Sequence, residues 1–178
     1  MLKFSRISGG KKKLKKRGVL NQPLSSALAG LGHGDSFLLC DAGFPIPKDA
    51  ERVDLALSFG IPDMKQCLSA ILDEVIIQKI VIAEEMKKMN CSGYQLVETV
   101  FKEQEKEIIK QNELLEKAKK VKFIVRCGET GYYSNIEKEV LSAGFFGSNN
   151  EIFFSGSLVK AKLNWYNMVN KSMRRRTS

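Results

Sequence analysis

Hydrophobic residues recur at helical spacing near the start of the chain. The first such set consists of four leucines at Leu20, Leu24, Leu28 and Leu31. This spacing is typical of one face of a helix. Asn21 is a suitable N-cap, and Gly30 is suited to the C-terminus. The pattern predicts a short helix that leads into the segment Leu31–Asp35.

A second amphipathic pattern predicts a longer helix after residue 63. Its apolar stripe consists of Met64, Cys67, Leu68, Ile71, Leu72, Val75 and Ile76. Asp63, followed three residues later by Gln66, has the sequence of a capping box. Further helices are expected over residues 94–106 and 112–119. We interpret Glu84 and Glu85 as helix-start carboxylates that complement the helix dipole, and not as a catalytic pair.

Three short apolar runs predict strands that are buried on both faces: 36–40 (SFLLC), 79–83 (KIVIA) and 123–127 (FIVRC). Asp41 follows the first of them. In open α/β sheets, ligands collect at the carboxyl ends of the strands. Residues 43–47 contain Pro45 and Pro47, which exclude a helix and predict a stiff extended loop beside Asp41.

The alternation of strands and helices predicts an α/β protein, and 178 residues suffice for one domain with appendages. We expect a single three-layer domain over residues 18–147, with a central mixed sheet flanked by helices. A basic N-terminal arm over residues 1–17 and a basic C-terminal extension over residues 148–178 are expected at its two ends.

The net charge of +9 is concentrated in these two ends. Residues 1–17 hold eight basic and no acidic residues, and residues 148–178 hold six basic residues and one acidic residue. Residues 18–147 carry 15 basic and 19 acidic residues, a net charge of −4. Contact with nucleic acid or an anionic membrane is therefore a hypothesis about the ends alone, and we give it less weight than a function of the core.

The cysteines and the targeting signals narrow the class of protein. The four cysteines form no CxxC pair and the chain has one histidine, so we expect no metal site and no cofactor. Cys40, Cys67 and Cys127 lie in apolar patterns, where a free thiol serves as a small hydrophobic side chain. No apolar run approaches the roughly 18 residues of a membrane span, and no secretory signal is recognisable. We therefore expect a cytoplasmic protein.

The single histidine, His33, lies between two glycines just before the first predicted strand. In such a loop its ring can reach solvent or a substrate. A histidine that closes a turn or caps a helix produces the same local pattern. Its position alone does not decide between these interpretations.

The wider set of motifs resembles the D-ribose pyranase and L-fucose mutarotase family. The segments that carry the resemblance are Gly18–Asn21, Leu31–Asp35, Cys40–Pro47, Arg52–Leu57, Ile82–Lys87, Val125–Thr130 and Tyr133–Ile136. Together they extend over about residues 18–146. The Pro-Ile-Pro loop and the VDLAL segment are similar to the ribose branch of the family, and a fucose-type mutarotase is the alternative.

The resemblance implies a cofactor-independent isomerase that interconverts the pyranose and furanose forms of D-ribose. His33 matches the family's catalytic histidine, and Asp41, Tyr133, Ser134 and Asn135 match its substrate-binding residues. Ring opening requires a base for the anomeric hydroxyl and an acid for the ring oxygen, and histidine can exchange protons near neutral pH. We expect His33 and Asp41 to combine across one short strand. The family also implies homo-oligomeric rings, commonly decamers, with sites at subunit boundaries.

The chain departs from the family pattern in two places. Gln111 lies where the family has a second, sugar-contacting histidine; glutamine can bind a hydroxyl but cannot exchange protons near pH 7. A catalytically weakened sugar-binding or scaffold protein is therefore the second hypothesis. Residues 137–139 (EKE) look like an insertion before a last strand over residues 140–146. For the tail beyond residue 147, a membrane-surface helix, a partner-binding helix, an RNA contact and a disordered extension remain open.

Overall fold

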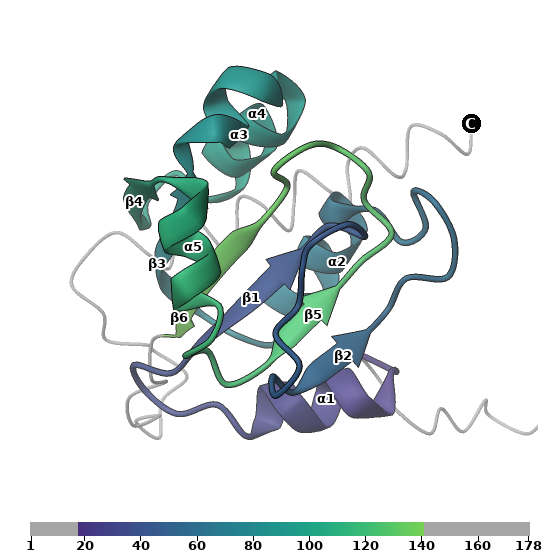
Figure 1. Cartoon of the computed structure of the whole chain (residues 1–178). Coiled ribbons are helices and arrows are strands. Elements are labelled where there is room, and N and C mark those ends of the chain that lie inside the picture. Colours follow the sequence, from purple (N-terminus) through teal and green to yellow (C-terminus); the bar gives the residue numbers. More distant parts are fainter. Residues whose placement is uncertain (1–17, 141–178) are drawn as a thin grey trace, which may run out of the picture.

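The computed structural model describes residues 18–140, so predictions about both basic ends and about residues 141–146 lie outside the described residues. Figure 1 shows one twisted sheet with the strand order β2-β5-β1-β6-β3-β4. The strands are β1 (Ser36–Cys40), β2 (Arg52–Asp54), β3 (Ile77–Ala83), β4 (Glu105–Ile109), β5 (Ile124–Arg126) and β6 (Ile136–Val140). All strands are parallel except β6, which runs antiparallel to its neighbours β1 and β3. The predicted mixed sheet is confirmed.

These directions create two functionally different edges of the sheet. At one edge of the sheet, β1, β3, β4 and β5 end and β6 begins. We call it the carboxyl edge, and we call the opposite edge the amino edge. Loops that follow parallel strands collect at the carboxyl edge, where open α/β sheets bind their ligands.

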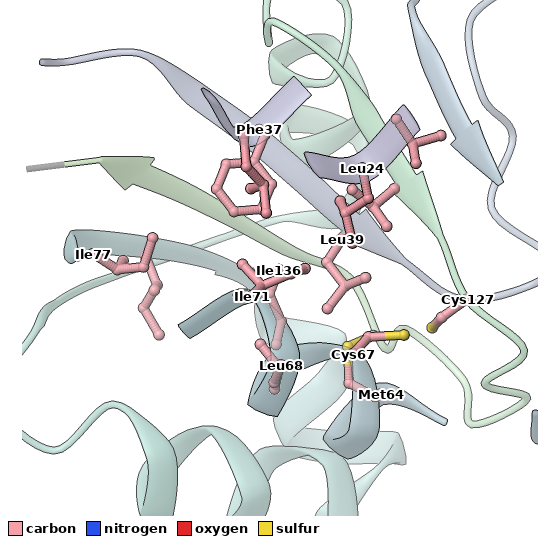
Figure 2. Close-up of a cluster of buried hydrophobic side chains, with 14 of the residues drawn as sticks. Leu24, Phe37, Leu39, Met64, Cys67, Leu68, Ile71, Ile77, Cys127 and Ile136 are labelled. Atoms are coloured by element: carbon pink, nitrogen blue, oxygen red, sulfur yellow. The ribbon is translucent and has the colours of Figure 1, made fainter. Parts of the chain in front are cut away.

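Helices cover both faces of the sheet, which gives the predicted three layers (Figure 1). The helices are α1 (Gln22–Ala29), α2 (Met64–Leu72), α3 (Glu84–Met89), α4 (Cys91–Val100) and α5 (Gln111–Lys117). Side chains of α1, α2 and α4 join the larger buried cluster, part of which Figure 2 shows. Leu114 and Ala118 of the α5 segment join the second cluster, on the other face. Within residues 18–140, no helix has the length and apolar character needed to cross a membrane.

The capping residues identified in the sequence form the bonds expected of them. The Asn21 Oδ1 atom accepts a hydrogen bond from the Leu24 amide at 2.9 Å. Asp63 and Gln66 complete a reciprocal capping box, with bonds of 2.7 and 2.9 Å. The second helix is shorter than predicted. It ends at Leu72, and the chain then turns toward β3.

The predicted helix over residues 94–106 is wrong in its second half. Helix α4 ends at Val100, and residues 105–109 form the edge strand β4. This strand pairs in parallel with β3. Lys79 of β3 forms ion pairs of 3.0 Å with Glu105 and with Glu107 of β4. Pairing with a neighbouring strand therefore outweighs the helical preference of this charged segment.

Residues 137–139 do not form an insertion before the last strand, because they lie within β6 in the middle of the sheet. Lys138 is opposite Phe37 of β1 and Ile80 of β3, and it is fully buried. Its Nζ atom donates a hydrogen bond of 3.1 Å to the Ile136 carbonyl and lies 5.3 Å from the centre of the Phe37 ring. By lying between β1 and β3, β6 satisfies backbone groups on both strands, although its three central residues, 137–139, are charged.

Candidate active site

Asp41 and Asn135 lie side by side at the carboxyl edge, where β1 ends and β6 begins. The Asp41 amide donates a hydrogen bond of 3.1 Å to Asn135 Oδ1. The Asp41 Oδ1 atom accepts one of 2.9 Å from the Gly43 amide, which closes a tight turn at the start of the proline loop. The adjoining Ala42 amide donates to the Glu129 carbonyl at 2.9 Å, which joins this turn to the segment after β5.

The carboxyl group of Asp41 is largely buried in this turn. Burial raises the pKa of Asp41, although hydrogen bonds from the Gly43 backbone and the Asn135 side chain oppose the shift. The group therefore takes up a proton at higher pH than an exposed aspartate. A carboxyl group of this kind can accept hydrogen bonds from sugar hydroxyls.

The segment Tyr133–Ser134–Asn135 enters β6 with an unusual backbone. Tyr133 has a φ of 57°, and the Asn135 amide donates to the Tyr133 carbonyl at 2.8 Å. Ser134 and Asn135 are only 3% and 2% exposed, whereas Tyr133 is half-buried. Of these three side chains, that of Tyr133 is therefore the most accessible to a ligand.

Gln111 lies at the same edge but farther along it. It is the first residue of α5, after β4, and its amide donates a hydrogen bond of 3.0 Å to Glu85 Oε2. Two strand spacings separate β4 from β6, which corresponds to about 10 Å. Among residues 18–140, the buried Gln111 Oε1 atom has no hydrogen-bond partner.

His33 is exposed and lies at the amino edge. Its loop is joined to the end of β6 by bonds from the Gly34 amide to the Val140 carbonyl (3.1 Å) and from the Val140 amide to the Asp35 carbonyl (2.9 Å). The five residues of β1 separate this loop from Asp41 and span about 16 Å. The expected combination of His33 with Asp41 across one short strand therefore does not hold within one chain. The structure brings Asp41, Tyr133, Ser134 and Asn135 together, and it places His33 at the opposite edge.

Two residues that support this edge were not singled out in the sequence. The Glu129 Oε1 atom accepts hydrogen bonds from the Thr130 and Gly131 amides at 2.9 and 2.8 Å. The Asn90 side chain reaches from the junction of α3 and α4 to the Ser134 hydroxyl. A predicted helix start at Cys91 would have identified Asn90 as an N-cap. Its hydrogen bond to Ser134 could not be predicted in this way, because it depends on tertiary structure.

The fold and the polar cluster at the carboxyl edge define an α/β protein with a candidate site for a small polar ligand. The sequence profile of the RbsD / FucU transport protein family matches residues 14–144. The chain belongs to this family. The prediction of the family is thereby confirmed.

Individual relatives extend over the same part of the chain. D-ribose pyranase of Bacillus cytotoxicus is 39% identical over 131 residues, which are 74% of this chain and 98% of that protein. D-ribose pyranase 2 of Rubrobacter xylanophilus is 45% identical over 124 residues, which are 69% of this chain and 80% of that protein. The solved structure of Bacillus subtilis RbsD complexed with D-ribose has a TM-score of 0.71 and 32% identity, and the match includes 75% of this chain and 100% of that chain.

A more distant structural neighbour supports the fold alone. The fucose mutarotase of Streptococcus pneumoniae in complex with L-fucose has a TM-score of 0.59 at 20% identity. The match includes 67% of this chain and 91% of that chain. The similarity shows that the same α/β architecture occurs in that protein.

Proposed function

We propose that this protein is a cofactor-independent isomerase that interconverts the pyranose and furanose forms of D-ribose. The proposal rests on the cluster of Asp41, Tyr133 and Asn135 at the carboxyl edge of a chain that shares 37–45% identity with D-ribose pyranases. In this reaction a base takes the proton of the anomeric hydroxyl while an acid protonates the ring oxygen. Closure through a different hydroxyl returns both protons, so the reaction requires no redox step.

In the proposed site, Asp41 binds sugar hydroxyls and His33 transfers protons. The Tyr133 hydroxyl and the side-chain amide of Asn135 provide directional hydrogen bonds to a neutral polyol, and Ser134 is part of the same segment. Gln111 provides a further polar group along the edge. Histidine is the type of side chain that can both accept and donate a proton in acid–base catalysis.

We further propose that His33 of one copy acts at the carboxyl edge of another copy in a cytoplasmic homo-oligomer, for which the family expectation is a decamer. The separation of His33 from Asp41 within one chain supports a site shared between copies. Large apolar side chains are also exposed at the carboxyl edge, including Leu57, Phe59 and Tyr132. The loop that carries Phe59 is attached beside the candidate site, since the Gly60 amide donates to the Gly128 carbonyl at 2.6 Å. Burial of such side chains favours self-association.

Saturation-transfer NMR on millimolar D-ribose tests the proposed reaction. The wild-type protein is expected to accelerate pyranose to furanose exchange, and Asp41→Asn is expected to lower the rate about 10- to 100-fold by weakening hydrogen bonds to a charged group. Asp49→Asn, at an exposed aspartate of the same loop region, is the matched control and should leave the rate unchanged. The proposal would be abandoned if the wild-type protein did not accelerate exchange. Acceleration confined to L-fucose would favour a fucose-type mutarotase instead.

The replacement of the family histidine by Gln111 favours the second candidate, a sugar-binding or scaffold protein with weakened catalysis. If this residue limits the rate, Gln111→His should accelerate exchange about 10-fold or more, because an added proton-transfer group typically contributes at least that much. Gln95→His adds an imidazole at an exposed position of α4 and should have no effect. Ribose binding without exchange in both the wild type and Gln111→His would support the scaffold function and would show that the glutamine is not the cause.

A further inference from the structure

We infer that Asn90 is a positioning residue for the sugar site, and that its side-chain amide holds Tyr133 in the backbone conformation required for binding. The role of Asn90 in sugar binding rests on the proposed function, because Tyr133 is one of the proposed sugar contacts. Its structural basis is independent of that function. It consists of the contacts of one nearly buried side chain with two separate segments.

One half of the Asn90 side chain caps a helix. Asn90 lies between α3 and α4 and is 8% exposed. Its Oδ1 atom accepts hydrogen bonds from the Gly93 amide at 2.9 Å and from the Ser92 hydroxyl at 3.0 Å. This is the usual N-cap interaction, and it uses only the oxygen of the amide.

The other half of the same side chain contacts the proposed sugar-binding segment. The Nδ2 atom donates to the Tyr132 carbonyl at 2.9 Å and to the Ser134 hydroxyl at 2.8 Å. An amide nitrogen carries two hydrogens, and both are used here. The two acceptors belong to the residues on either side of Tyr133.

Tyr133 is in the left-handed region of backbone conformation, with a φ of 57°. A bulky residue adopts this conformation only when surrounding contacts impose it. Because Asn90 bonds both neighbours of Tyr133, its amide fixes the two ends of this short arc. Loss of these bonds would allow the backbone to relax and would displace the Tyr133 ring, which packs against the larger hydrophobic cluster.

Two glycines leave the space that the Asn90 amide occupies. A Cβ atom at Gly93 would lie 2.7 Å from Asn90 Nδ2, and one at Gly131 would lie 2.8 Å from the same atom. Both distances are too short for a side chain to be added without displacement of the amide. Two segments that are distant in sequence are therefore shaped around one side chain, which agrees with a role beyond the helix cap.

The substitution Asn90→Asp separates the two roles of the side chain. A carboxylate keeps the acceptors for Gly93 and Ser92, so the cap of α4 is retained. It has no hydrogen to donate to the Tyr132 carbonyl. We expect the dissociation constant for D-ribose, measured by titration calorimetry, to rise about 10-fold, the effect of one or two lost hydrogen bonds. The rate of exchange at saturating ribose should change less than the affinity.

Asn21→Asp is the matched control, because Asn21 caps α1 through the same kind of Oδ1 contact. It should leave the affinity for ribose unchanged. Urea unfolding of both variants measures any general loss of stability.

A double-mutant cycle with Tyr133→Ala tests whether Asn90 acts through Tyr133. If it does, Asn90→Asp should not weaken ribose binding further in the Tyr133→Ala background. Additive losses, or a change in affinity of less than about twofold in the single variant, would overturn the inference.

A measurement without sugar separates this inference from the proposed function. The ¹³Cα and ¹³Cβ chemical shifts of Tyr133 report its backbone conformation. They should change in Asn90→Asp and remain unchanged in Asn21→Asp. Unchanged shifts in Asn90→Asp would overturn the inference even if ribose binds. If the wild type shows neither ribose binding nor exchange, the proposed function fails, whereas the shift change would still support the positioning of Tyr133 by Asn90.

Discussion

A His33→Ala variant is expected to lose pyranose to furanose exchange, and to regain it in part when it is assembled together with an Asp41→Ala variant. Removal of a proton-transfer group typically lowers a rate about 10²- to 10⁴-fold. His33 lies at the amino edge and Asp41 at the carboxyl edge, with the length of β1 between them. If a site takes these residues from two copies, a mixed oligomer contains sites in which both are intact.

The fraction of intact sites in the mixed oligomers determines how much of the exchange rate is recovered. After co-refolding of equal amounts of the two variants, random assortment in a head-to-tail interface leaves about a quarter of the sites intact. Saturation-transfer NMR on ribose measures the rate, and native mass spectrometry verifies that mixed oligomers have formed. The double variant His33→Ala/Asp41→Ala, assembled with either single variant, is the control and should remain inactive. No recovery in verified mixed oligomers would exclude a site shared in this way.

Lys138→Met is expected to stabilise the protein, with the largest effect below about pH 7. Lys138 is fully buried in the middle strand of the sheet, and loss of hydration lowers the pKa of this lysine to about 7. In the unfolded chain its pKa returns toward 10.5. Between these two values the unfolded state binds more protons than the native state, so the Lys138 contribution to the free energy of unfolding rises with pH. Below the native pKa the full cost of burying the charge is present.

Methionine has a similar length, fills the same space beside Phe37 and carries no charge. Urea unfolding at pH 6 should therefore give a free energy of unfolding about 2 kcal/mol or more above that of the wild type, as expected when a buried charged group is replaced by an apolar one. This difference in free energy of unfolding between the variant and the wild type should shrink as the pH rises from about 7 toward 10. Lys102→Met, at an exposed lysine, should change neither the stability nor its pH dependence. A Lys138→Met variant less stable than the wild type at pH 6 would contradict the assignment of a buried, destabilising charge.

The sequence predicted the parts of the fold that depend on local interactions. Helix starts at Asn21 and Asp63 follow from side chains that cap the nearest amides. Strand β1 follows from a short apolar run and has the predicted ends, and β5 lies within the apolar run at residues 123–127. The cluster of Asp41 with Asn135 was accessible through the family motifs, although these residues are far apart in the chain.

Other features were decided only by tertiary structure. Residues 105–109 form a strand because β3 supplies pairing partners, and residues 137–139 form one because β1 and β3 both bind them. No local pattern could predict either result, since the preferences of these charged segments differ from the structure they adopt. The contact of Asn90 with the segment around Tyr133 joins residues more than 40 positions apart.

The candidate site shows the same division. The sequence by itself determined which residue types are available for sugar chemistry: one histidine, the aspartate after β1 and the Tyr-Ser-Asn segment before β6. The direction of the strands decided where they lie. Because an extended strand carries the residues before and after it to opposite edges of the sheet, His33 and Asp41 are close in sequence but are separated in space by the length of β1.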